Sequence, residues 1–195
     1  MERRHSAGRG RERAAVAAGV TDQLSTAWAN FDEQLTFHHE GEHEIAWPAL
    51  KSIGVSEDVI RAMDAEHETM AAALTEARTA MDALGRTAGG AQSTAALTAM
   101  RRLKGVTVEH LDHEEAELEE LYLSKRETPE MKAMGRQFGK VSPARGGRFF
   151  AWVLDGATPD ERSAVTKEVP GPVLKVLGGV FGRGYRKNVA RAWRS

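Results

Sequence analysis

Apolar residues recur at alternating steps of three and four along most of the chain, the spacing of helices that bury one face. Four segments carry this period, at about residues 2–18, 22–47, 57–84 and 93–122. The expected breaks between them are Gly19-Val20-Thr21-Asp22, Pro48 and Gly89-Gly90, and Ser56 can cap the third segment. Long helices with short connections predict an all-α fold, an up-down four-helix bundle.

Shorter helical pieces follow Pro129, and Pro and Gly residues divide them. We expect the bundle to occupy residues 1–125, and residues 126–195 to form a helical C-terminal extension that packs on it. The apolar residues expected at that contact are Phe149, Trp152, Val153, Leu174, Leu177 and Phe181.

Five polar residues interrupt the apolar stripes of the three longer segments. These residues are His38, Glu42, His67, His110 and Glu114. Burying a carboxylate without a partner costs several kcal/mol, and a buried imidazole also needs partners. Five such groups at the middles of three stripes therefore predict a shared cation.

The spacing of these residues supports a metal site. His38 and Glu42, like His110 and Glu114, are four residues apart, which places each pair on one helix face. The histidines are expected as terminal ligands and the two glutamates as bridges between ions. Imidazole and carboxylate ligands without thiolate suit iron or manganese, and also zinc. Coordination positions that the protein leaves open are where dioxygen or peroxide would bind. His39, His43 and His113 lie off the stripes and are expected in solvent or behind the ligands.

Composition removes several other classes of protein. The chain has no cysteine, which excludes disulfides, thiolate zinc sites and iron–sulfur clusters. No apolar run is long enough for a transmembrane segment and no secretory signal is evident, so a cytoplasmic location is expected.

Charge is unevenly distributed along the chain. From Arg136 onward there are 12 Lys and Arg against 4 Asp and Glu. Residues 173–193 could form a basic amphipathic helix that contacts an anionic membrane surface. We expect no nucleic-acid binding, because no motif of a known module accompanies the basic residues Arg183, Arg186, Lys187, Arg191 and Arg194.

Three ordered motifs resemble the hemerythrin, or HHE cation-binding, family. They are His38-His39-Glu40-Gly41-Glu42 with Pro48 six residues after Glu42, Glu66-His67, and His110-Leu111-Asp112-His113-Glu114. The resemblance covers about residues 22–122 and extends to actinobacterial members with a similar C-terminal tail. It implies a four-helix bundle around two non-haem iron ions bridged by carboxylate and oxo groups. The family's activities include oxygen binding or sensing, iron handling and reactions with peroxide or nitric oxide.

The family also draws a histidine from its first helix, and His5 is the candidate in this chain. The alternative is that this ligand lies upstream of Met1, or that the site has one ligand fewer.

The leading hypothesis is therefore a di-iron protein that binds dioxygen or a related small oxidant. A peroxide-consuming, catalase-like enzyme would use the same ligands, and turnover of peroxide would distinguish it. A metal-free helical interaction module is the third alternative, but it would leave Glu42 and Glu114 buried without a cation.

Overall fold

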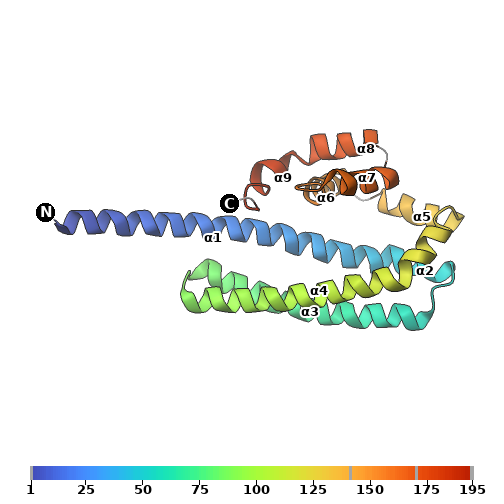
Figure 1. Cartoon of the computed structure of the whole chain (residues 1–195), viewed down its shortest axis with the longest axis horizontal. Coiled ribbons are helices and arrows are strands. Elements are labelled where there is room, and N and C mark those ends of the chain that lie inside the picture. Colours follow the sequence, from blue (N-terminus) through green and yellow to red (C-terminus); the bar gives the residue numbers. More distant parts are fainter. Residues whose placement is uncertain (1, 141, 170, 194–195) are drawn as a thin grey trace.

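The computed structural model describes the backbone of residues 2–140, 142–169 and 171–193, and the side chains in these ranges from Thr21 onward except Glu168. Helices and turns make up the described chain, which contains no strand. The long helices are α1 (Glu2–Gly41), α3 (Glu57–Arg86) and α4 (Gly90–Lys125). They run up and down beside one another (Figure 1). The predicted all-α bundle is confirmed, and none of the described helices is both long and apolar enough to cross a bilayer.

The break expected at residues 19–22 is absent, because α1 runs without interruption from Glu2 to Gly41. A glycine costs a helix ~1 kcal/mol, which neighbouring helix-forming residues can offset when no proline is present. The Thr26 hydroxyl donates to the carbonyl oxygen of Asp22 within the continuing helix, 2.8 Å away. Figure 1 shows the start of α1 extending past the ends of α3 and α4.

Pro48 was expected to end the second segment, but it lies in the first turn of a new helix. A π-helical turn, η1 (Glu42–Ala46), follows α1 and leads directly into α2 (Trp47–Ser52). The Trp47 N–H donates to the Glu42 carbonyl oxygen five residues back. Proline is tolerated in a first turn, where its missing N–H would have no partner.

The π-turn also moves the buried stripe by one residue. Ile45, expected on the stripe, is only partly buried, whereas Ala46, Trp47 and Leu50 are buried. An α-helix has 3.6 residues per turn, so the wider turn shifts every later residue around the helix axis.

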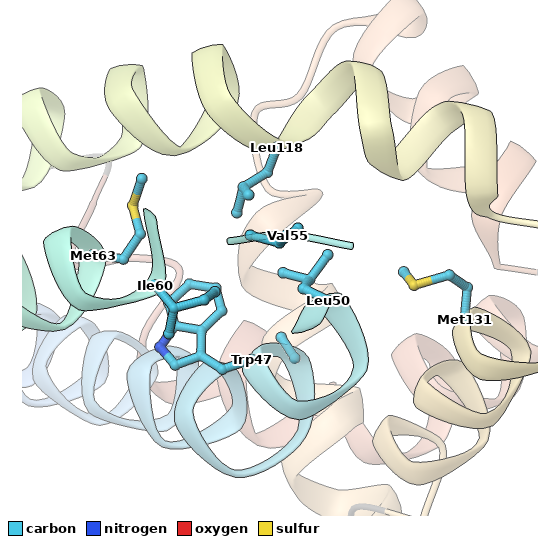
Figure 2. Packing of buried hydrophobic residues seen from close by; sticks show 8 residues of the cluster. Trp47, Leu50, Val55, Ile60, Met63, Leu118 and Met131 are labelled. Atoms are coloured by element: carbon cyan, nitrogen blue, oxygen red, sulfur yellow. The ribbon is translucent and has the colours of Figure 1, made fainter. Parts of the chain in front are cut away.

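Helix α3 begins as expected, because the Ser56 hydroxyl accepts a hydrogen bond from the Val59 N–H. Two apolar clusters hold the long helices together. The first surrounds Trp47 and joins α2, α3, α4 and α5 (Figure 2); its buried members are Ala46, Trp47, Leu50, Val55, Ile60, Met63, Leu118 and Met131. The second joins α1, α3 and α4 through Leu35, Ala73, Leu74, Ala77 and Leu103. His67 and His110 lie between the two clusters in sequence, on α3 and α4.

The C-terminal segment turns back along α1 (Figure 1). It contains α5 (Pro129–Phe138), α6 (Pro143–Val153), α7 (Pro159–Glu168), α8 (Gly171–Val176), the π-turn η2 (Leu177–Phe181) and α9 (Arg183–Asn188). The Trp152 ring meets the Phe31 ring of α1 edge to face at 6.4 Å, and Arg148 pairs with Glu33. Leu174 is buried as expected.

Three details of this segment differ from expectation. Val153 and Phe181 were expected to be covered, but they are 38% and 40% exposed. Residues 173–193 form short pieces instead of one amphipathic helix. Gly147 lies inside α6, where a Cβ would fall 2.3 Å from the Phe181 Cβ and 2.6 Å from the Leu177 carbonyl oxygen. Only glycine allows η2 to approach α6 this closely.

Candidate metal centre

The structure brings five of the six predicted ligands together at the middle of the bundle. Helix α1 and the π-turn supply His38 and Glu42, α3 supplies His67, and α4 supplies His110 and Glu114. The sixth, His5, falls among the side chains that the structure does not describe.

Glu42 lies at the centre of the group and is 5% exposed. Its Oε1 is 3.0 Å from the His38 Nε2, and its Oε2 is 3.3 Å from the His67 Nε2. Each carboxylate oxygen thus faces a histidine from a different helix. Glu42 therefore has one oxygen on each of two sides of the group.

A second chain of contacts runs from α3 to α4. The Nε2 atoms of His67 and His110 are 3.1 Å apart, and the His110 Nδ1 lies 2.9 Å from the Glu66 Oε2. The other oxygen of Glu66 lies 2.7 Å from the His113 Nδ1. A carboxylate can only accept hydrogen bonds, so His110 carries its proton on Nδ1 and directs the Nε2 lone pair toward His67. Glu66 therefore fixes the orientation that a metal ligand needs.

The pKa shifts of His110 and Glu66 agree with a neutral imidazole beside an ionised carboxylate. Burial lowers the pKa of His110, although its hydrogen bond to Glu66 opposes the shift. Burial alone would raise the pKa of Glu66, but hydrogen bonds from His110 and His113 lower it overall. At neutral pH His110 is thus a neutral imidazole that is held by the ionised carboxylate of Glu66.

His39 belongs to the group, although the sequence analysis placed it off the stripe. Its ring centroid is 4.4 Å from that of His67, and its Nε2 is buried without a hydrogen-bond partner. Burial, then the neighbouring His67 and His38, lower its pKa to about 4, so the imidazole is neutral at pH 7. The signal that could have found it is the three-residue spacing between His39 and Glu42, which also puts two side chains on one helix face.

Trp47 and Asp64 support the group from the side of α2. The indole stacks on the His67 ring with centroids 5.6 Å apart, and its N–H donates to the Asp64 Oδ1 at 2.9 Å. The exposed His43 lies 3.6 Å from the same oxygen. Because Trp47 is buried, its ring limits the rotation of the imidazole.

The two central glutamates have opposite pKa shifts. Burial alone would raise the pKa of Glu42, but its contacts with His38 and His67 lower it to about 2. Burial, then the charge of Glu42, raise the pKa of Glu114 to about 7. Two carboxylates this close do not both ionise readily without a cation between them.

The residues of this group fit a metal ion. Two sets of three each place ligand atoms within 4.8 Å of one another: His38, Glu42 and Glu114, and His39, Glu42 and His67. The Oε2 of Glu42 is buried without a properly oriented hydrogen bond, and so is the His39 Nε2. Within the described ranges no Lys or Arg is buried that could neutralise the carboxylates.

The family model of the hemerythrin HHE cation-binding domain matches residues 2–122, more than half of the chain. The chain belongs to the hemerythrin family. The match spans the whole His and Glu group, from α1 to α4, and ends before α5. Comparisons with curated proteins and with solved structures gave no match. The group of His and Glu side chains thus lies within the segment that matches a cation-binding family.

Proposed function

We propose that this hemerythrin-like chain holds two non-haem iron ions and binds dioxygen or a related small oxidant at them, in the cytoplasm. The observation that carries the proposal is the position of Glu42. It belongs to both sets of potential ligands, and its two oxygens face histidines on different helices.

The ligands divide between two positions. His38, Glu42 and Glu114 would hold one ion, and His39, Glu42 and His67 the other, with the Nε2 of His110 beside His67. Each set supplies fewer than the six donors of an octahedral shell, so positions remain for water or a small ligand. When bound, iron supplies one-electron redox chemistry toward dioxygen, peroxide or nitric oxide. His5 remains the prediction for a further ligand from the start of the chain.

The surrounding residues prepare this group for metal binding. Neutral His39 and His110 offer nitrogen lone pairs at pH 7 without first losing a proton. Glu66 and Trp47 hold the rings of His110 and His67 in place. A metal-free module is less consistent with this arrangement, because it leaves buried atoms of His39 and Glu42 without hydrogen bonds, at ~1–3 kcal/mol each.

Iron content and the visible spectrum test the proposal. We expect about two irons per chain after purification from iron-supplemented cells, and a visible band that appears when the reduced protein meets oxygen. Glu42→Gln should lose most iron from both positions, because Glu42 is common to both ligand sets. Glu44→Gln is the matched control, since Glu44 is exposed two residues away and its change removes the same charge.

The outcomes separate the three hypotheses. Consumption of many equivalents of hydrogen peroxide per chain would favour the peroxide enzyme over a binding protein. A colourless wild-type protein that takes up no added iron would refute the iron centre. Equal iron content in the Glu42→Gln and Glu44→Gln variants would refute the ligand assignment.

A further inference from the structure

A cavity of about 560 Å³ adjoins the His38, Glu42 and Glu114 side of the centre. It lies between α1, α4 and the first two helices of the C-terminal segment, α5 and α6. Its other lining residues are Phe37, Ala46, Leu50, Glu115, Leu118, Glu119, Tyr122, Met134, Phe138, Gly146, Phe149 and Phe150.

The cavity is far larger than a small oxidant requires. A water molecule occupies ~30 Å³ in the liquid, and a diatomic ligand is of similar size. Cavities of ~300–1,000 Å³ are those that enclose organic ligands of drug size. The space beside the centre is therefore sized for an organic molecule.

The lining indicates the class of that molecule. Four phenylalanines, Met134 and two leucines make most of the wall apolar. The ionisable residues of the wall besides Tyr122 are His38 and four glutamates, two of which, Glu115 and Glu119, are exposed. Among the described side chains no Lys or Arg lines the cavity; the Arg145 guanidinium lies near it, 5.0 Å from the ring centroid of Phe37. An anionic headgroup would meet like charges here, whereas an ammonium group would meet opposite ones.

We propose that this cavity binds a lipophilic amine, with its apolar body against the phenylalanines and its ammonium group beside Glu115 and Glu119. The site shares three residues with the proposed iron centre, but it is formed without a metal. The C-terminal segment then has a binding role, because α5 and α6 supply Met134, Phe138 and Phe149 to its wall.

Displacement of a neutral fluorescent probe tests the proposal on the full-length protein. We expect N-phenyl-1-naphthylamine to bind with increased fluorescence, and decylamine to displace it at concentrations at least ten-fold below those of decanoate. Absence of probe binding, or displacement by decanoate as effective as by decylamine, would overturn the proposal.

Two pairs of variants locate the binding site. Glu119→Lys reverses a charge on the wall, and Glu120→Lys makes the same change at the next residue, which does not line the cavity. Both side chains are exposed, so folding is preserved. Decylamine should displace the probe at least five-fold less effectively from Glu119→Lys only. Met134→Glu should weaken the probe itself, whereas Gln137→Glu, exposed on the same helix, should not. Equal behaviour within the first pair would overturn the assignment, whether or not Met134→Glu folds.

Measurements with and without iron keep this proposal separate from the proposed function. Preferential displacement of the probe by decylamine from chelator-treated protein supports the amine site even if the chain takes up no iron. Absence of probe binding both in a protein that contains two irons and after chelator treatment overturns the amine site alone.

Discussion

Replacing Glu66 should weaken metal binding although Glu66 is not a predicted ligand. Its carboxylate accepts hydrogen bonds from His110 at 2.9 Å and from His113 at 2.7 Å. His110 is 1% exposed, and its Nδ1–H has Glu66 as its acceptor in the folded protein. Without the carboxylate, the His110 ring loses both its orientation and its negatively charged partner.

Two substitutions grade the effect. In Glu66→Gln the amide oxygen can still accept from the His110 Nδ1, while its NH₂ group faces His113, which can change tautomer. The charge alone is lost, and we expect an affinity about 10-fold lower, or ~1.4 kcal/mol. Glu66→Ala removes both the charge and the acceptor that orients the buried His110 ring. We expect a loss of about 100-fold, or ~2.7 kcal/mol, together with a less stable fold.

Anaerobic competition for Fe²⁺ against a chromogenic chelator measures these affinities. Glu68→Gln is the control, because Glu68 is exposed on α3 two residues away and the change removes the same charge. Circular dichroism shows whether each variant is folded. The reasoning is refuted if Glu66→Gln and Glu68→Gln bind iron equally well, or if Glu66→Ala binds no more weakly than Glu66→Gln.

Three further predictions concern stability. The pKa of Glu114 is raised to about 7 in the folded metal-free protein. Between pH 4.5 and 7 the folded protein therefore binds more protons than the unfolded one, and its free energy of unfolding falls as the pH rises. Glu114→Gln should therefore raise the free energy of unfolding by about 2 kcal/mol more at pH 8 than at pH 4.5 in urea titrations, and Glu117→Gln should not. Gly147→Ala should lower the free energy of unfolding by ~1–3 kcal/mol in the same assay, because the added methyl group would clash with η2. Gly146→Ala is the control: its Cβ would have no neighbour closer than 3.9 Å, so the free energy of unfolding should be unchanged or higher. Arg78→Met removes the bidentate ion pair between Arg78 of α3 and Asp32 of α1, and should lower the free energy of unfolding by ~1 kcal/mol. If Arg78→Met lowers it by the same amount in a protein that already carries Asp32→Asn, the two side chains do not stabilise the fold as a pair.

Most of the candidate centre could be predicted from the sequence because helical geometry is regular. The four-residue spacing of the His38–Glu42 and His110–Glu114 pairs fixes each pair to one face, wherever the helix lies. His67 was detectable because it interrupts an apolar stripe between Met63 and Met70, both of which are buried. The Ser56 cap was equally local.

The rest depends on contacts between distant segments. His38 precedes Glu42 by four residues and His39 precedes it by three, so both spacings fit the face that carries Glu42 and spacing alone does not show that both rings join the group. Residues 45–47 are all apolar, and no pattern shows which of them is buried once a π-turn intervenes. By propensity Gly147 indicates a helix break. In the structure it lies inside a helix, where its missing side chain allows Phe181, 34 positions later in the chain, to approach the backbone closely.

The π-turn at Glu42–Ala46 determines how α2 is rotated about the helix axis relative to α1. The π-turn contains one residue more than an α-helical turn would. It separates His38 and His39, which precede it, from Trp47, which follows it. If the same residues formed a regular α-helix with none removed, α2 would be rotated by ~100° relative to α1. Trp47 and Leu50 would then leave the core while His38 and His39 stayed in place. Deletion of the one extra residue should therefore keep Trp47 and Leu50 in the core as part of a regular α-helix, whereas insertion of a further residue should turn both side chains away from it.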